Sequence, residues 1–276
     1  MMGSLLSEGD HLYVDRKHPQ WKSAMLEMLR IMNEVKKQTG ASVIQLRDLD
    51  TSDVEMRDFL IKEGFIKAEM PDTHIIQKLD WSSSEEFLKR LSHKTRYYVR
   101  KDVVKLEHHF DIKYIDKNVP VSEERIKQWY NLYLNVKAQS YNLNTFVLPY
   151  KLFRNINNYE GWETIEISFN NDLDERYKNN NSPVAVVFCY KAKKGNYCPM
   201  IIGMNYDFND EYHIYRQALY QMVKKAREIN SKQVYIGMDA SIEKQKLGAI
   251  KVPKSTFIQA EDNYNMELIS LLKSSE

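Results

Sequence analysis

The sequence predicts an α/β protein in which a mixed β-sheet is flanked by helices. Three observations predict this class. From Tyr212 to Asp262, amphipathic helical patterns alternate with short β-rich runs. Three further strand candidates precede that stretch, and its order of elements occurs a second time near the N-terminus. A chain of 276 residues can form one large domain or two small ones, with a substantial core.

Composition argues against several classes of protein. The 40 Lys+Arg against 38 Asp+Glu give a formal net charge of +2, which is no global footprint for nucleic acid but leaves room for a local basic patch. The two cysteines, Cys189 and Cys198, face each other across a predicted hairpin, so we expect no disulfide framework and a cytoplasmic location. No apolar run approaches the ~20 residues of a membrane span, and the N-terminus lacks the apolar core of a signal peptide.

Residues 1–80 are expected to form an incomplete first lobe. The expected elements are a helix at 20–39, a strand at 42–49, a helix from Thr51 or Ser52 to Gly64, and extended structure at 65–79. Before them, residues 11–15 supply at most one strand. Residues 62–77 resemble residues 246–259, which indicates an internal duplication.

Residues 81–110 are expected to form one long basic amphipathic helix that links the two lobes. Ser82–Ser84 followed by two glutamates is a good N-terminal cap. The basic face fits a solvated surface, a cleft for an anionic substrate or donor phosphate, or a stripe that contacts RNA. Tyr97 and Tyr98 among these cations suit stacking on a base, although at least one of them should belong to the core.

Residues 111–276 are expected to form the second, complete lobe. The expected elements are a strand at 111–115, helices from Ser122 and at 148–157, strands at 162–169, 183–191 and 197–206, a helix at 214–226, a strand at 234–236, a short helix ending at Gly248, and a strand at 252–260. A ligand crevice in such a sheet lies near strand ends and helix N-termini.

The order of a helix, then YIGMD, then EKQKLGA resembles the C-terminal half of GNAT-type acyltransferases. The most similar branch contains the Fem-type peptidyltransferases and related acetyltransferase-6 proteins. In that branch a glycine follows the strand, and a lysine precedes a Gly-Ala or Gly-Phe pair by four residues. Gly237, Lys244 and Gly248-Ala249 stand at those positions. LSHKTRYYVRK resembles the K-x-R-x-x-x-R helix of the same branch, whose members consist of two GNAT-like lobes.

The resemblance implies N-acyl transfer by direct attack of a primary amine on a thioester, either acyl-coenzyme A or an acyl-carrier protein. The usual phosphate loop before the long helix is absent from residues 203–217, which leaves a carrier-protein or tRNA-borne donor open. The alternatives are an aminoacyl-tRNA-dependent Fem-like transferase and a non-catalytic accessory domain of a fused or partner enzyme. The histidines show no metal-ligand spacing, so no metal is expected.

The reaction needs a donor site, hydrogen-bond donors for the oxyanion and a route for the amine proton. The expected catalytic residues are Asp239, Lys244 and Tyr206; the expected donor-binding residues are Arg216, Tyr215 and Gly203; and the expected substrate-binding residues are Arg96, Arg100 and Tyr97. Each has a plainer alternative. Arg216 fits a surface salt bridge, Lys244 a solvated cation, and Asp239 or Ser241 the cap of the next helix.

Overall fold

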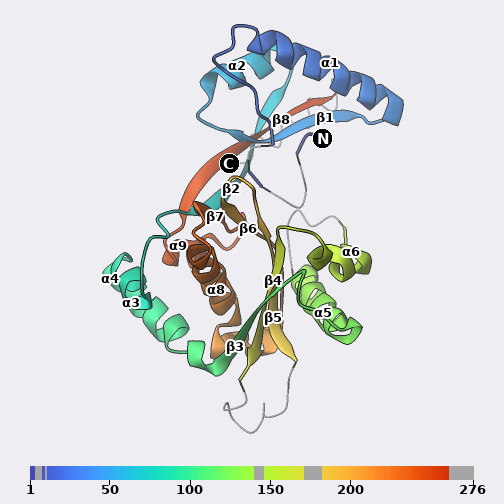
Figure 1. Ribbon diagram of the computed structural model, residues 1–276. Coiled ribbons are helices and arrows are strands. Elements are labelled where there is room, and N and C mark those ends of the chain that lie inside the picture. Colours follow the sequence, from blue (N-terminus) through green and yellow to red (C-terminus); the bar gives the residue numbers. More distant parts are fainter. Residues whose placement is uncertain (4–7, 10, 140–145, 171–181, 261–276) are drawn as a thin grey trace. The chain divides into compact units, whose positions relative to one another are not determined.

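The chain forms two compact units, which are described separately (Figure 1). The computed structural model describes residues 1–3, 8–9, 11–139, 146–170 and 182–260. The first unit contains residues 1–73 and the chain from residue 251, and the second contains residues 74–250. Both combine helices with β-strands, and the strand pairing is mixed, which confirms the predicted fold class.

The first unit is a small sheet with helices packed against it. Its elements are α1 (Trp21–Thr39), β1 (Val43–Asp50), α2 (Val54–Lys62), β2 (Ile66–Ile76) and β8 (Ile250–Ala260). The strand order is β1-β8-β2, with β1 and β8 antiparallel, and β2 continues into the second unit. The core contains Trp21, Met25, Leu46, Leu60 and Phe257.

Two details of this unit differ from the prediction. The cap of α2 is neither Thr51 nor Ser52 but Asp53, whose Oδ1 accepts the Met56 N–H at 3.0 Å. The chain forms a turn at residues 51–52 before the helix begins. Asp53 is therefore the residue whose side chain reaches a free main-chain N–H of the first helical turn. Residues 11–15 form no strand, because they have no strand partner within the described part of the chain.

The second unit is built on a larger sheet with the strand order β2-β7-β6-β5-β4-β3. Its further strands are β3 (Phe110–Asp116), β4 (Trp162–Phe169), β5 (Pro183–Lys191), β6 (Asn196–Met204) and β7 (Gln233–Tyr235). Within the described residues the strands of this sheet pair antiparallel, except that β6 and β7 are parallel. β4 and β5 have the predicted bounds, and the other strands lie close to theirs.

Helices cover both faces of this sheet (Figure 1). They are α3 (Ser84–Lys89), α4 (His93–Val99), α5 (Glu123–Gln139), α6 (Tyr150–Asn155), α7 (Asn209–Tyr212), α8 (Ile214–Glu228) and α9 (Ser241–Lys246). On one face α8 packs over β4 to β7, around Ala218, Met222 and Val223. On the other face α5 and α6 enclose a second core with Trp129 and Phe153 at its centre. None of the described helices is long and apolar enough to cross a membrane.

The prediction of a single long helix over residues 81–110 is wrong. The segment is α3, then α4, a π-helical turn at Arg100–Val104 and a 3-10 turn at Glu107–His109. The break lies at Ser92, whose Oγ accepts the Thr95 N–H at 3.3 Å and starts a new helix. The Ser92 side chain therefore competes successfully with helix continuation.

The division into two related lobes, residues 1–80 and 111–276, rests on the internal duplication in the sequence and stays a prediction. The compact units divide the chain elsewhere, because β8 pairs with β1 of the first unit. Residues 81–110 fold within the second unit, where Leu88, Val99 and Val103 join the core beside α8. Residues 261–276 of the predicted second lobe lie outside the described residues.

Candidate functional site

The candidate site begins where the parallel strands β6 and β7 separate. They pair only at Asn196↔Gln233 and Tyr197↔Val234. From Cys198 to Met204, β6 continues and pairs with β5 alone. Main-chain groups on the other edge of β6 are therefore left without a strand partner in the described part of the chain. Such an edge can present N–H groups to a bound carbonyl.

The N-terminus of α8 reaches this region, but the protein's own side chains occupy it. The Tyr215 N–H donates to Asn209 Oδ1 at 3.1 Å. The Arg216 guanidinium donates to Asp102 Oδ2 and to Glu243 Oε2, both at 2.7 Å. A free helix N-terminus attracts phosphate. Here Arg216, the cation nearest to that N-terminus, is already paired with the carboxylates of Asp102 and Glu243. The Tyr215 N–H and the Arg216 guanidinium are thus already engaged by protein groups, and acyl-coenzyme A as the donor stays a prediction.

The surroundings of Arg216 continue this ion-pair network. Lys246 Nζ donates to Glu243 Oε1 at 2.8 Å. Burial alone would raise the pKa of Glu243, but hydrogen bonds from Lys246 and Arg216 and their charges lower it overall. A hollow of about 10 Å³ lies between Tyr98, Asp102, Arg216 and Lys246, enough for about one water molecule. The geometry favours the salt-bridge interpretation of Arg216.

We therefore expect Arg216→Ala to lower the free energy of unfolding by about 2 kcal/mol, because the buried Asp102 loses its arginine partner and Glu243 keeps only Lys246. Urea denaturation measures this. Arg154→Ala, which removes an exposed arginine 3.6 Å from Glu123, is the control and should change stability by less than about 0.5 kcal/mol. Unchanged stability with a tenfold weaker donor affinity would instead identify Arg216 as a donor ligand.

Three predicted residues gather beside this network. Burial raises the pKa of Tyr215 well above its usual range, and the nearby Asp239, Glu243 and Tyr206 raise it further. Burial also raises the pKa of Tyr206, so its phenol stays protonated at neutral pH. Asp239 is exposed just after β7 and does not cap α9, whose N-cap is Ala240. The structure thus brings Tyr206, Tyr215 and Asp239 together, and their roles stay predictions.

Lys244 and Gly203 have surroundings that the sequence did not suggest. Lys244 lies on α9 and is 4% exposed, so its interpretation as a solvated cation is wrong. At Gly203, a Cβ atom would lie 2.5 Å from the Tyr133 nitrogen and 2.7 Å from the Leu132 carbonyl carbon of α5. Close packing of α5 on β6 therefore accounts for this glycine, and its donor-binding role stays a prediction.

The predicted substrate-binding arginines are directed at α3. Arg96 donates through Nε to the Leu88 carbonyl at 2.9 Å and through Nη2 to the Lys89 carbonyl at 3.0 Å, which satisfies free carbonyls at the end of α3. Arg100 pairs with Glu85 at 2.7 Å. Tyr97, by contrast, is 62% exposed. Of this trio, only Tyr97 presents most of its side chain to solvent.

Sequence reasoning missed a serine–histidine pair at the end of β7. His74, on β2, is 1% exposed; its Nε2 lies 2.9 Å from Ser241 Oγ and its Nδ1 lies 3.0 Å from the Gly237 carbonyl. A carbonyl can only accept, so Nδ1 carries a hydrogen, and in the neutral form of the ring Nε2 accepts the hydroxyl hydrogen of Ser241. The only available signal was a histidine among the apolar residues of a strand.

The Gly237–Ser241 connection holds this serine in place. The main chains of β2 and β7 exchange hydrogen bonds from His74 N–H to Gly237 at 3.2 Å and from Ile236 N–H to His74 at 3.0 Å. Ala240 then adopts φ +54°, a left-handed conformation that is strained for a residue with a side chain. This turn directs the first residue of α9, Ser241, towards the buried imidazole. The pair places a hydroxyl in hydrogen-bond contact with an imidazole nitrogen.

Comparisons with solved structures show similar folds. No protein-family model and no curated protein sequence matches the chain. L-PGS from Bacillus licheniformis has a TM-score of 0.60 and 10% identity, over 92% of this chain and 78% of that one. The C-terminal domain (DUF2156) of a putative lysylphosphatidylglycerol synthetase from Agrobacterium fabrum has a TM-score of 0.59 and 8% identity, over 92% of this chain and 77% of that one.

A tandem GNAT protein from the clavulanic acid biosynthesis pathway has a TM-score of 0.52 and 7% identity, over 89% of this chain and 71% of that one. At such identities a likeness shows the fold alone. The resemblance to the Fem-like branch and the tandem-lobe organisation stay predictions. The chain has a GNAT-like fold.

Proposed function

We propose that the protein is an acyltransferase that moves an acyl group from an activated donor to a primary amine. The observation that carries this proposal is the separation of β6 and β7 with the His74–Ser241 pair at the end of β7. The edge of β6 beyond its pairing with β7 would offer main-chain N–H groups to an acyl group. The pair gives the amine proton a destination. The fold shared with the GNAT protein and the L-PGS domains supports the same class.

In the proposed reaction the amine nitrogen attacks the carbonyl carbon of the donor, and a C–N bond forms. N–H groups on the free edge of β6 donate to the oxyanion. The amine proton passes to Ser241 Oγ while the hydroxyl proton moves to His74 Nε2. The bond to the leaving group then breaks, the leaving atom keeps the electron pair, and Tyr206 supplies its proton. Burial keeps the pKa of Tyr206 above its usual value, so the phenol holds that proton beforehand.

We propose a thioester on a carrier protein as the donor, in preference to acyl-coenzyme A. A carrier-bound thioester brings no nucleotide pyrophosphate into the α8 N-terminus, where Asn209, Asp102 and Glu243 already occupy the Tyr215 N–H and the Arg216 guanidinium. The acceptor is a small primary amine. The proposed reaction uses no metal, and the proposed location is the cytoplasm.

A second candidate is transfer from an aminoacyl-tRNA. Lys94, Tyr97 and Lys101 are exposed at i, i+3 and i+7 along α4 and the π turn, and Lys105 follows one turn later. In the described part of the chain, none of these lysines forms an ion pair. Cations interleaved with an exposed aromatic ring suit an RNA backbone and an unstacked base.

Thermal unfolding with a panel of donors distinguishes the candidates. The panel holds acyl-coenzyme A, an acylated carrier protein and an aminoacyl-tRNA, and mass spectrometry then detects the acylated amine. A donor at 100 times its Kd should add about 2.7 kcal/mol to stability. Stabilisation and product with the carrier thioester support the first proposal. Product with the aminoacyl-tRNA, lost in Lys94→Glu/Lys101→Glu, supports the second. No stabilisation and no product with any donor would indicate an accessory domain.

A further inference from the structure

The first unit contains a polar cavity of about 210 Å³, separate from the residues considered so far. It lies between the segment before α1, the end of β1 and the start of α2. Its polar wall is formed by His11, Arg16, Asp48, Asp50, Asp53 and Arg57. Its apolar wall is formed by Leu12, Val14, Leu49, Met56 and Phe257. Such a mixture of an apolar surface and a few polar groups is typical of small-molecule sites.

One carboxylate in this wall is buried and incompletely satisfied. The Asp48 side chain is 0% exposed; its Oδ2 accepts from Arg47 Nε at 2.8 Å and lies 3.1 Å from His11 Nε2. Its Oδ1 has no hydrogen-bond partner within the described residues. An unsatisfied buried acceptor costs about 1–3 kcal/mol, and more when it is charged. The unit keeps Asp48 in the cavity wall despite this cost.

The backbone at Asp48 is strained as well. The register of β1 against β8 shifts between Leu46 and Leu49, so the strand contains a bulge. Within this bulge Asp48 has φ +63°, a left-handed conformation that costs about 1–2 kcal/mol for a residue with a side chain. Bulges and strained residues of this kind concentrate where a side chain is aimed at a ligand. Burial and strain therefore mark the same residue independently.

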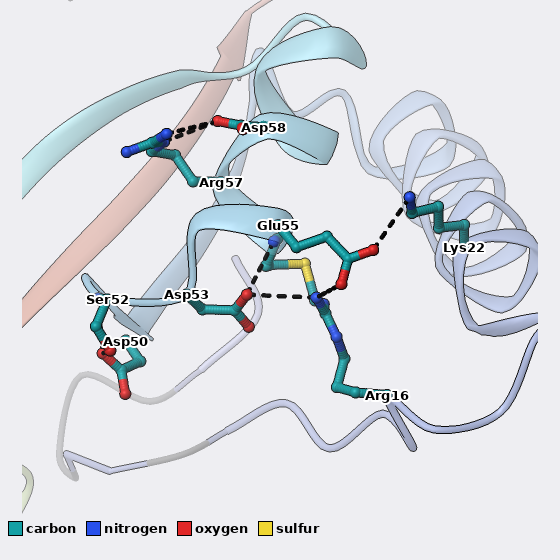
Figure 2. A network of polar contacts seen from close by, with 9 residues as sticks. Arg16, Lys22, Asp50, Ser52, Asp53, Glu55, Arg57 and Asp58 are labelled. Atoms are coloured by element: carbon teal, nitrogen blue, oxygen red, sulfur yellow. Dashed lines mark hydrogen bonds and ion pairs between the residues drawn. The ribbon is translucent and has the colours of Figure 1, made fainter.

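The other two aspartates each use one oxygen for the local fold. Asp50 Oδ1 accepts from the Ser52 N–H at 2.8 Å and from Ser52 Oγ at 2.7 Å. Asp53 Oδ1 accepts from the Met56 N–H at 3.0 Å and from Arg16 at 3.3 Å (Figure 2). No hydrogen bond within the described part of the chain uses Oδ2 of either residue. The hydrogen bonds from Ser52 lower the pKa of Asp50, which stays ionised at neutral pH.

The arginines of the wall are also engaged by carboxylates outside the cavity. Arg16 donates to Glu55 at 2.9 Å, as well as to Asp53, and its guanidinium carbon lies 3.6 Å above the Trp21 ring. Arg57 pairs with Asp58 at 2.8 Å (Figure 2). Both cations are thus shared with carboxylates, Glu55 and Asp58, that do not line the cavity. Arg47 in turn pairs with Asp48, and Arg16 Nη1 is a buried donor without a hydrogen-bond partner among the described residues. The unused oxygens of Asp48, Asp50 and Asp53 still outnumber this donor on the polar side of the cavity.

We propose that this cavity binds a small organic cation, a primary ammonium carried on a short aliphatic chain. The ammonium offers three N–H donors to the aspartate oxygens, and the chain packs against Leu12, Val14 and Phe257. A metal ion is a poorer match, since the described residues form no group of three or more side chains placed to ligate one. This site does not depend on the proposed acyl transfer, because all its residues lie in the first unit.

Binding to the intact protein tests the proposal, with n-pentylamine and 1,5-diaminopentane as probes. Isothermal titration should give saturable binding for both amines. n-Pentanol and pentanoate, which have the same chain length without the positive charge, should not bind measurably. No saturable binding of either amine, or equal binding of n-pentanol, would overturn the proposal.

Variants then locate the binding. Asp50→Asn/Asp53→Asn should raise Kd for n-pentylamine at least tenfold, while asparagine preserves the turn and the helix cap that these aspartates form. Asp48→Asn should raise Kd similarly. Glu27→Gln, an exposed carboxylate on α1 that pairs with Arg30 and does not line the cavity, is the control and should bind with the original Kd. An equal loss in Glu27→Gln, or unchanged binding in both the double variant and Asp48→Asn, would contradict the proposed site.

Discussion

His74→Gln is expected to lower kcat for acyl transfer by about 100-fold or more, the usual contribution of a general base. Glutamine can still accept a hydrogen bond from Ser241, but it cannot take the proton. KM for both substrates should change little, because the imidazole is buried at 1% exposure and holds the serine rather than the substrate. Steady-state kinetics with the donor identified in the panel measure both parameters.

Two further variants separate catalysis from a purely structural role of His74. Ser241→Ala should lower kcat comparably while the melting temperature changes little, since the serine is only half-buried. His93→Gln changes an exposed histidine on α4 and should leave kcat unaltered. A merely structural histidine would show the reverse pattern, with lower stability and a kcat within about threefold of the original protein.

Gly203→Ala is expected to destabilise the protein by about 3 kcal/mol, at the upper end for overpacking. The added methyl group would meet main-chain atoms of Leu132 and Tyr133, 2.7 and 2.5 Å away, which cannot rotate aside as a side chain can. Either α5 or β6 must shift, and the core between them would lose packing. Chemical denaturation followed by circular dichroism measures the change.

Gly248→Ala is the matched control in the same unit. Its φ of +91° makes alanine unfavourable by about 1–2 kcal/mol, but the nearest atom to the new Cβ would be a Leu91 side-chain carbon at an ordinary 3.7 Å. Gly203→Ala should therefore cost clearly more than Gly248→Ala. Equal losses would mean that α5 can move away from β6 at little cost.

The predicted helices and strands succeeded where the apolar pattern was long and regular. β4 and β5 occupy the predicted ranges because nearly every residue in them is buried. α1 ends before Gly40, whose φ of +66° suits a glycine after a helix. The prediction of one helix over residues 81–110 failed because the apolar residues keep helical spacing across the break at Ser92. Ser92, followed three residues later by Thr95, was the local signal for a new cap.

The candidate site was less predictable, because its side chains come from separate parts of the sequence. Arg216 was identified beside the α8 N-terminus, but its partner Asp102 lies 114 residues earlier in the chain. Ser241 and His74 are 167 residues apart and meet only because β2 and β7 are neighbours. A search for consecutive catalytic motifs does not find such a pair.

The sequence by itself determined the α/β class, most element boundaries and the region that holds the candidate site. These depend on local periodicity and turn residues, which act over a few positions along the chain. The tertiary structure decided which predicted residues are engaged by partners, which are buried and which meet. Arg216 forms an ion pair, and Gly203 allows close packing of α5 on β6. Asp48 and His74 stand out only because they are buried beside residues that are distant in the sequence. Burial and long-range pairing depend on how strands align in the sheet, which no short stretch of sequence encodes.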